Sequence, residues 1–234
     1  MCYNPPMVAA AHQPQYLPWL GYFDKMARCD VFIYLDDVQY KKREFQNRNR
    51  VRVKNGEQWL TVPVASKGRY TQAIHEVEIE GTAWAKDHWT ALTLAYAKAP
   101  FFKQHAGELD SFYKRPWPLL GPMNEALADF HRQALGIQTP LRRSSEFNVQ
   151  SAKTERLVAL CRAVGADTYL SGQGARDYLQ EELFQKAGIR VVYQEFAHPA
   201  YPQAYEGFHS HLAALDLIFN CGPEAGKILL RNTR

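Results

Sequence analysis

Two stretches of the chain have the order strand, helix, strand, and this order constrains the fold more than any other feature. In the first stretch, residues 7–12 and 30–35 are short apolar runs of the kind that form buried strands. Residues 19–28, which follow Pro18, have the pattern of a helix. This order predicts a β-α-β unit, in which the strands are parallel and the helix covers the sheet.

The second stretch repeats this order near the C-terminal end. Residues 151–164 carry apolar side chains on one helical face, and DTYLS at 167–171 has the composition of a strand. The small-residue turn GQGA at 172–175 is expected to open a helix that ends at Gly188, before the strand IRVVYQEF at 189–196. The two units together predict an α/β fold with a mostly parallel, Rossmann-like sheet.

Between the two units, the pattern first favours antiparallel strands. Residues 48–54 alternate charged and apolar side chains, and Gly56 separates them from WLTVPV at 59–64. Alternation with a glycine between two runs predicts a hairpin whose first strand has one face in water. Residues 74–79 predict a further strand.

A long helical stretch follows this hairpin. Residues 84–135 have the pattern of three helices, broken at Pro100 and near KRPWPLLGP, and their aromatic stripe is expected to pack in the core. We therefore expect residues 1–234 to form a single α/β domain with a mainly helical insert at about 82–136.

The composition excludes several classes of protein. The chain has 234 residues, of which 46% are apolar and 22% charged, as in an ordinary soluble globule. Its four cysteines, at positions 2, 29, 161 and 221, form no CxxC pair and are expected to be reduced thiols. There is no signal-peptide pattern and no apolar run of about 18 residues, so we expect a cytoplasmic protein without a membrane span.

Positive charge is concentrated in one segment. Residues 41–54 contain seven cations and one acid, Glu44, for a local charge of +6. Since the whole chain carries +4, the rest carries −2. This asymmetry predicts an anionic partner that binds locally.

Polar residues follow three of the expected parallel strands, at the point where each strand ends. Ligands of such sheets gather at the carboxyl ends of the strands, so these residues are expected to share one edge. The three groups are His12 with Gln13, Asp36 with Asp37, and Ser171 with Gly172.

Acid-base chemistry is expected in the first two groups. His12 can act as a base or ligand beside the amide of Gln13, although a buried histidine that fixes the following loop is the alternative. Asp36 and Asp37 are adjacent on a strand end, so only one is expected to face a pocket, and the alternative for each is a turn or helix cap. Two neighbouring carboxylates are a weak metal signature, and no metal is assigned.

The sequence FQNRNR places side chains alternately on two faces of a strand. Gln46 and Arg48 share one face, and Asn47 and Asn49 share the other. In a cleft, Arg48 would bind a phosphate or carboxylate and the asparagines would bind hydroxyl or carbonyl groups. The alternative is a solvated strand face, and nucleic-acid binding is not expected because no recognised module accompanies the patch.

Further candidates lie toward the C-terminal end. The backbone N–H groups of SGQGA, from Ser171, can cradle an anion at a helix start, although a tight turn explains the glycines equally well. Tyr178 can reach back toward Ser171. Asp216 and Asn220 are four residues apart on an apolar helix and therefore share one face. Such a buried polar pair is either part of a site wall or an anchor between the helix and a loop.

Several of these segments together resemble the WbqC-like family, from about Val8 to Glu224. The segments are HQPQYLPWLGYFDKM, DVFIYLDDVQY, FQNRNRV, WLTVPV, TERLV, GADTYLSGQGARDYL and LDLIFNCGPE. The resemblance implies a role in lipopolysaccharide, O-antigen or related biosynthesis. Tyr16, Trp19 and Gln39 lie within these motifs and complete the substrate-binding candidates. The chain departs from the family pattern at Gln180, where an acid is expected, so no role is assigned there.

A nucleotidylyltransferase-like fold is an alternative, because the first unit has a glycine near its helix start. The residues at the place of that superfamily's HxGH motif are Trp19, Leu20, Gly21 and Tyr22. The two histidines that stabilise a transferring phosphate are therefore absent from it. The fold analogy can hold while nucleotidyl transfer fails.

We expect a cytosolic bacterial enzyme that transfers an acyl, aminoacyl or glycosyl group onto an activated anionic precursor. His12 or Asp37 would be the base, Gln13 and Asn47 would orient the acceptor, and Arg48 with the SG turn would hold the anion. The precursor would be a nucleotide-sugar or a carrier-bound acyl group, and no cofactor is assigned. The alternatives are a non-catalytic partner or carrier-recognition protein of such a pathway, and a nucleotidylyltransferase-like enzyme with a degenerate motif.

Overall fold

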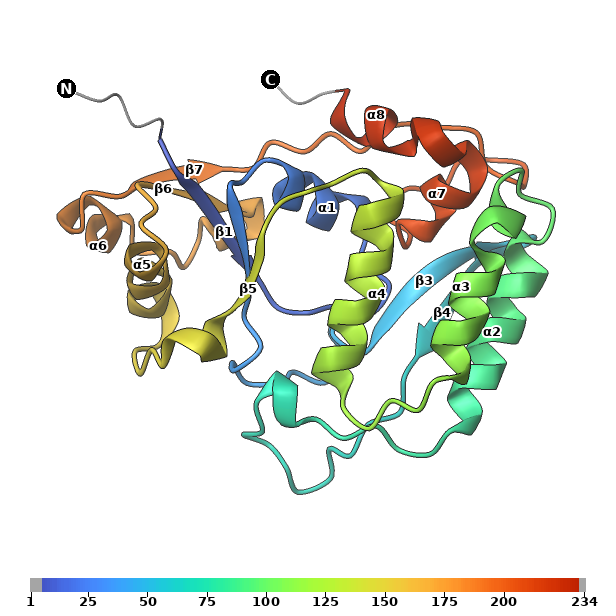
Figure 1. The fold of residues 1–234 in the computed structure, drawn as a ribbon, viewed down its shortest axis with the longest axis horizontal. Coiled ribbons are helices and arrows are strands. Elements are labelled where there is room, and N and C mark those ends of the chain that lie inside the picture. Colours follow the sequence, from blue (N-terminus) through green and yellow to red (C-terminus); the bar gives the residue numbers. More distant parts are fainter. Residues whose placement is uncertain (1–5, 232–234) are drawn as a thin grey trace.

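A central sheet of five parallel strands organises the molecule (Figure 1). The computed structural model describes residues 6–231. The strands, in their spatial order, are β5 (Leu141–Arg143), β2 (Val31–Tyr34), β1 (Val8–His12), β6 (Thr168–Ser171) and β7 (Arg190–Tyr193). Numbered along the chain, this is the order 3-2-1-4-5 of a Rossmann-like sheet, so the α/β fold class is confirmed.

Alternation along the central strands divides the core into two layers. Ala10 of β1 and Phe32 of β2 face one layer, and Ala9 and Ile33 face the other. The register aligns Ala10 with Phe32, so like-facing residues lie side by side. Both faces are therefore apolar, as expected for a parallel sheet that is covered twice.

Helices cover both faces. The first layer contains the helices α1 (Leu20–Ala27), α4 (Leu120–Ala134), α7 (Leu215–Cys221) and α8 (Ala225–Leu230). The second layer contains α5 (Lys153–Ala163) and α6 (Glu181–Lys186), which lie against the other face (Figure 1). Gly165 and Gly188 follow these two helices with φ of +73° and +72°, the left-handed conformation that glycine adopts without strain.

An antiparallel hairpin and two helices extend the first layer. The hairpin consists of β3 (Arg48–Val53) and β4 (Gly56–Thr61), as the alternation predicts. The helices α2 (Ala83–Tyr96) and α3 (Phe102–Lys114) lie beside it (Figure 1). Together with α4, these are the three helical segments expected between 84 and 135.

The prediction of a strand at 74–79 is wrong. Ile74–Glu76 forms the 3₁₀ turn η1, and only isolated bridges follow it. The backbone N–H groups of Ile74 and His75 donate to the carbonyls of Val38 and Asp36, at 3.0 and 2.9 Å. Since these donors bond to the loop after β2, they are not available for a ladder.

The prediction that a helix begins at GQGA is also wrong. Gln173–Ala175 forms the 3₁₀ turn η3, and α6 begins only at Glu181. Glu181 and Glu182 occupy the first turn of α6, where carboxylates are favoured by the helix dipole. Two further 3₁₀ turns, η2 (Ser144–Phe147) and η4 (Gly222–Glu224), precede α5 and α8.

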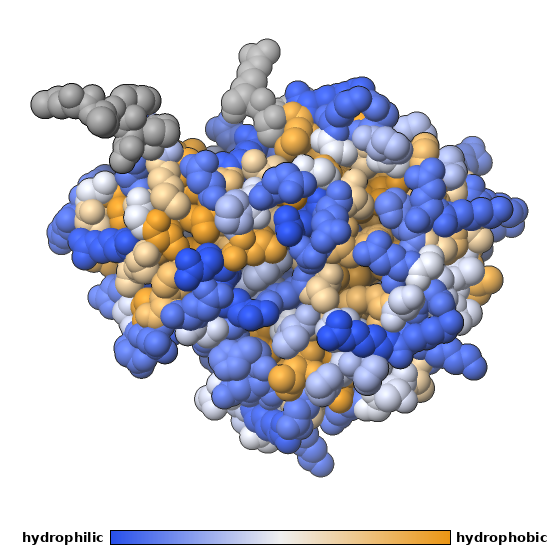
Figure 2. Space-filling view, viewed as in Figure 1, coloured by the Kyte–Doolittle hydropathy of each residue, from blue (hydrophilic) through white to orange (hydrophobic). Residues whose placement is uncertain are grey.

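The surface seen in Figure 2 is hydrophilic over most of its periphery, and apolar residues gather toward its middle. Within residues 6–231, no helix combines the length and the apolar character needed to cross a bilayer. Cys29, Cys161 and Cys221 are free thiols, and Cys2 lies outside the described residues.

A pair of glycine variants tests the packing of α8 on the end of α4. A Cβ at Gly226 would lie 2.3 Å from the carbonyl oxygen of Leu135, a backbone atom. We expect Gly226→Ala to lower the free energy of unfolding by about 1–3 kcal/mol in urea denaturation. Gly107→Ala is the control, because Gly107 is exposed in α3 with open space around it. It should be neutral or stabilising by up to about 1 kcal/mol, and equal destabilisation of both variants would contradict the packing.

Candidate functional site

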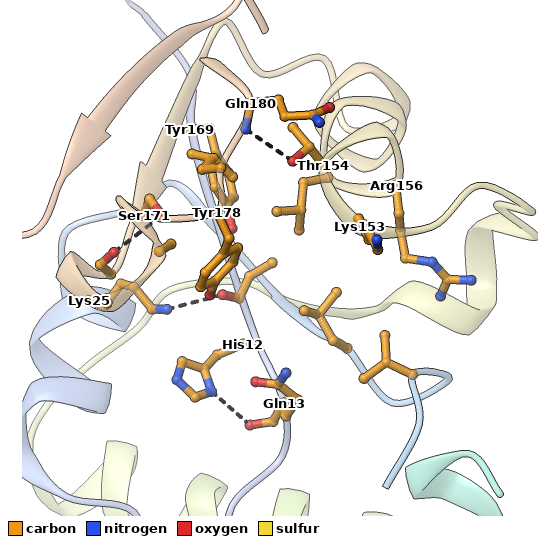
Figure 3. Close-up of a pocket in the computed structure, with 18 residues that line it drawn as sticks. His12, Gln13, Lys25, Lys153, Thr154, Arg156, Tyr169, Ser171, Tyr178 and Gln180 are labelled. Carbon is orange, nitrogen blue, oxygen red and sulfur yellow. Dashed lines mark hydrogen bonds between the residues drawn. The ribbon is translucent and has the colours of Figure 1, made fainter. Parts of the chain in front are cut away.

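A pocket of about 680 Å³ opens where β1 and β6 end (Figure 3). From β1 the chain continues to β2 on one side, and from β6 it continues to β7 on the other. This divergence is the topological switch point, where Rossmann-like sheets bind their ligands. His12 and Gln13 line the pocket from β1, and Ser171 and Gly172 line it from β6. The structure thus brings together two of the three strand-end groups.

Lys25 lies in the wall of this pocket and was not anticipated from the sequence. It comes from α1, its residue is only 4% exposed, and its Nζ donates to the carbonyl oxygen of Ala11 at 3.0 Å. Burial lowers the pKa of Lys25 to about 8, and the nearby Cys29 opposes this shift. The only sequence signal for it is a lysine beside Asp24 in a mainly apolar helix.

His12 is neutral at physiological pH and has a defined tautomer. Its Nδ1 lies 3.1 Å from the carbonyl oxygen of Gln13, so Nδ1–H donates and Nε2 is left as an acceptor. Burial lowers the pKa of His12 to about 3; the positive charge of Lys25 adds to this shift, and the bond to Gln13 opposes it. The ring packs edge-on against Tyr22, with 5.0 Å between ring centroids.

Two further cations line the opposite part of the pocket, at the start of α5. Arg156 is held by three acceptors: Asp37 Oδ1 at 2.6 Å, and the carbonyls of Ser151 and Val149 at 2.8 and 3.1 Å. Lys153 is exposed and begins the helix. The described residues that line the pocket include these two cations and Lys25 but no acid, so the pocket favours an anionic ligand.

Asp36 is a structural cap and does not line the pocket. Its carboxylate accepts from the hydroxyl of Ser144 at 3.1 Å and from the N–H and hydroxyl of Ser145 at 3.0 and 2.6 Å. Its backbone carbonyl accepts from His75. The geometry therefore matches the capping alternative for Asp36.

Asp37 also lies outside the pocket lining and contacts the pocket through Arg156. The hydroxyl of Ser144 hydrogen-bonds to Asp37 as well as to Asp36. The expectation that the two carboxylates point to opposite sides is therefore not met. β2 ends at Tyr34, so strand alternation no longer applies two residues later.

The residues of FQNRNR do not reach the pocket, contrary to the expectation that Arg48 and Asn47 share a cleft with His12. Arg48 stacks on Trp59 across the hairpin, 3.8 Å from the ring centroid. The amides hold backbone instead: Asn47 donates to Val62 at 2.8 Å, Asn49 donates to Leu17 at 2.6 Å, and Gln46 accepts from the N–H of Lys41 at 3.0 Å. The loop between β2 and β3 carries this segment away from the edge of the sheet.

Tyr16 lies in a buried hydrogen-bond chain and not in the pocket. Its hydroxyl is 2.7 Å from Nδ1 of His88 in α2 and 2.8 Å from the hydroxyl of Tyr113 in α3. It therefore joins the loop after β1 to two of the inserted helices.

Four other candidates also have structural partners. Trp19 stacks on His211 with centroids 5.5 Å apart, and Gln39 donates to the carbonyl of Tyr70 at 2.6 Å. Asp216 accepts from Gln203 at 2.7 Å, and Asn220 donates to the carbonyl of Asp216 at 2.7 Å. These contacts match the anchor interpretation of the pair on α7.

Ser171 and Tyr178 remain at the pocket, as the sequence predicts. The Ser171 hydroxyl donates to the Gly172 carbonyl at 3.4 Å, and Tyr178 is 71% exposed above the opening. The N–H of Gln180 donates to Thr154 Oγ1 at 3.2 Å, which ties the turn after β6 to α5. The sequence does not reveal the α5 contribution to the pocket, because the apolar face of residues 151–164 indicates only a helix that packs on the sheet.

Comparison with known proteins gives matches in sequence. The sequence matches the WbqC-like protein family over residues 13–228. It is 42% identical over 215 residues to the uncharacterized protein Rv1507c of Mycobacterium tuberculosis, covering 91% of this chain and 93% of that protein. No solved structure gives a significant match.

Replacing Asp36 tests its capping role. In Asp36→Asn an amide group would replace one acceptor oxygen among three donors, so we expect a loss of about 1–3 kcal/mol in the free energy of unfolding. Asp110→Asn is the control, because Asp110 forms only a helix-surface pair with Lys114. Urea denaturation should place the control within about 0.5 kcal/mol of wild type. A similarly small change in Asp36→Asn would contradict the cap.

The low pKa of His12 predicts a pH-dependent stability. The unfolded chain has a histidine pKa near 6.5 and the folded chain one of about 3, so the unfolded state binds more protons between these values. The stability from neutral His12 is complete above pH 6.5 and is lost as the pH falls toward 3. We expect wild type to lose more stability than His12→Gln between pH 7.5 and 4.5, measured by urea denaturation. A difference that does not change with pH would contradict the burial of this group.

Proposed function

Because the chain belongs to the WbqC-like protein family, we propose that it is a transferase acting on an activated, anionic precursor in the biosynthesis of surface polysaccharides or related natural products. One observation carries the proposal: the described lining of the switch-point pocket contains three cations and no acid. A volume of about 680 Å³ suits a small-molecule ligand.

Residues at the start of α5 would position the anion. Asp37 and two carbonyls fix the guanidinium of Arg156, so it is preorganised to bind a phosphate or carboxylate. Lys153 adds a second charge, and Ala152 makes no side-chain cap at the helix start. The first N–H groups of α5 therefore remain available to an anion. Asp37 acts through Arg156 in this proposal and is a positioning residue.

His12 would act as the general base that transfers the proton. Its Nε2 is an acceptor in the pocket wall, so it can take the proton from the nucleophile of an acceptor substrate. A bound anion would raise the pKa of His12 by adding negative charge nearby, which makes the imidazole a better base in the complex. Gln13 is placed beside it to orient the acceptor. The transferred group is proposed to be of acyl, aminoacyl or glycosyl type.

The proposal places this activity in the cytoplasm. Cys29, Cys161 and Cys221 are all free, as is usual for proteins of reducing compartments. The nucleotidylyltransferase alternative gains no support at positions 19–22. Leu20 and Tyr22 are buried there, and Trp19 packs on His211 and Phe196.

Binding of anionic precursors tests the pocket. We expect nucleotide-sugars or phosphopantetheine thioesters to raise the melting temperature of wild type, and added salt to reduce this shift. Lys153→Gln should weaken binding by about five- to tenfold at unchanged stability, because the exposed side chain has no hydrogen-bond or ion-pair partner among residues 6–231. Lys186→Gln, an exposed lysine on α6 outside the pocket, should bind as wild type does. Equal effects of both variants would reject the site.

A second candidate function is recognition of an acidic carrier protein, favoured by the surface of the hairpin. Arg48 lies 3.8 Å from the ring centroid of Trp59, and the neighbouring Phe45 and Trp59 are 38% and 44% exposed. The basic run from Lys41 to Arg43 precedes them. Cationic and aromatic side chains on one surface are typical anchors for a partner of opposite charge.

Binding to an acyl carrier protein, measured by calorimetry, tests this second candidate. We expect Arg48→Glu to abolish binding and Arg142→Glu, an exposed arginine in β5, to leave it unchanged. The absence of binding in wild type, or equal losses in both variants, would reject the partner.

A further inference from the structure

Lys25 is a buried cation without a counter-ion. Its Nζ has one hydrogen-bond partner, the carbonyl of Ala11, and no carboxylate among residues 6–231 forms an ion pair with it. The adjacent carboxylate of Asp24 accepts instead from Arg28 at 2.9 Å and from Gln194 at 2.6 Å. The amine is therefore left facing the pocket with unused hydrogen-bonding capacity.

An unpaired ammonium in this position destabilises the fold. Burying a charge destabilises a protein unless a partner compensates for the lost hydration, and an apolar side chain of similar length would fill the same space without that penalty. A ligand that reacts or pairs with the amine would explain a lysine at this position. Since the amine is partly desolvated, roughly a tenth of it is neutral near pH 7, far more than for an ordinary lysine.

The cations occupy two separate parts of the pocket (Figure 3). Lys25 lies beneath Ser171 on one side, and Lys153 and Arg156 lie on the other. His12 and Gln13 form the wall that connects the two sides. A ligand that spans the pocket therefore meets an amine at one end and an anion-binding pair at the other.

We propose that Lys25 forms a Schiff base with an aldehyde or ketone whose anionic group binds to Lys153 and Arg156. The proposal deepens the proposed function, because it rests on the same anion-binding end of the pocket and adds a carbonyl group to the substrate class. It does not depend on which group is transferred.

The chemistry balances without a further reactant. The lone pair of the neutral amine attacks the carbonyl carbon, and the carbonyl oxygen takes up a proton to give a carbinolamine. The carbon–oxygen bond then breaks, the oxygen leaves as water with both amine hydrogens, and a carbon–nitrogen double bond remains. His12, which lines the same pocket and has Nε2 left as an acceptor, can carry the proton from nitrogen to oxygen.

Three related probes separate covalent reaction from anion binding. Pyridoxal 5′-phosphate carries both a carbonyl and a phosphate, pyridoxal lacks the phosphate, and pyridoxine 5′-phosphate has an alcohol in place of the aldehyde. Wild type is incubated with each probe and reduced with borohydride, which converts an imine into a stable secondary amine. Peptide mass mapping then locates the label.

We expect pyridoxal 5′-phosphate to label Lys25 in preference to the exposed lysines, at a rate that rises with pH through about 8. Pyridoxal should label it about five- to tenfold more slowly, as should the phosphate probe in Lys153→Gln. Pyridoxine 5′-phosphate should protect Lys25 without being trapped. Lys25→Met should lose this label and remain folded by circular dichroism, and the mapping in wild type stands whether or not the variant folds.

The contrary outcomes are distinct. Labelling that does not favour Lys25 over exposed lysines such as Lys114 overturns the Schiff base. If Lys25 is not preferentially labelled but pyridoxine 5′-phosphate raises the melting temperature of wild type more than that of Lys153→Gln, the Schiff base falls while the anion site of the proposed function stands. If no phosphate probe binds and Lys25 is unlabelled, both proposals fail.

Discussion

The parallel pairing of β1 with β2 on one side and with β6 on the other decides where every group of the pocket lies. Because β1 is central, its carboxyl end is flanked by two strands whose chains turn away in opposite directions, and the space between them cannot be filled by backbone. α1 returns beside β1 and brings Lys25 to this space, whereas α5 precedes β6 and brings Arg156. The two ends of the pocket are thus set by sheet order and not by a local motif.

Two buried cations of this fold, Arg52 and Lys25, differ in how many hydrogen bonds they form. Arg52 is almost fully buried, and its guanidinium donates to the carbonyls of Val53, Gly56 and Glu206. Both terminal nitrogens of Arg52 therefore have carbonyl partners, although its buried Nε has none, and the side chain serves to fix the hairpin. Within residues 6–231, Lys25 has a single carbonyl partner. The difference in hydrogen-bond satisfaction separates a structural cation from one whose partner must come from outside.

Much of this arrangement follows from the sequence, because β-α-β periodicity and the strand-end rule are local and general. They locate His12, Gln13, Ser171 and Gly172 correctly at one edge. Arg48 could not be placed in the same way, since the direction of the hairpin depends on packing against α2 and on the loop after β2. The spacing of a helix does not reveal how it is rotated over the sheet, so Lys25 and Arg156 were missed for the same physical reason.

The roles of Asp36 and Asp37 show a different limit. Their sequence pattern fits a catalytic pair and a cap equally well, and only the serines of η2, more than a hundred positions away, distinguish the two. Such a partner contributes nothing to local periodicity. A single chain therefore predicts the type of group at a strand end better than the bond that this group makes.

The hydrogen bonds of Tyr16 to His88 and Tyr113 join the inserted helices to the loop after β1. The backbone of Thr61 also interacts with His88; when His88 Nε2 carries the proton and donates there, Nδ1 accepts the Tyr16 proton and Tyr16 accepts from Tyr113. The chain of donors thus runs one way, from α3 through the loop after β1 and α2 to β4. A second proton on His88, whose pKa burial lowers to about 4, would place two donors head to head at Tyr16. Acid would then weaken the contact between the inserted helices and the loop after β1 that carries Tyr16.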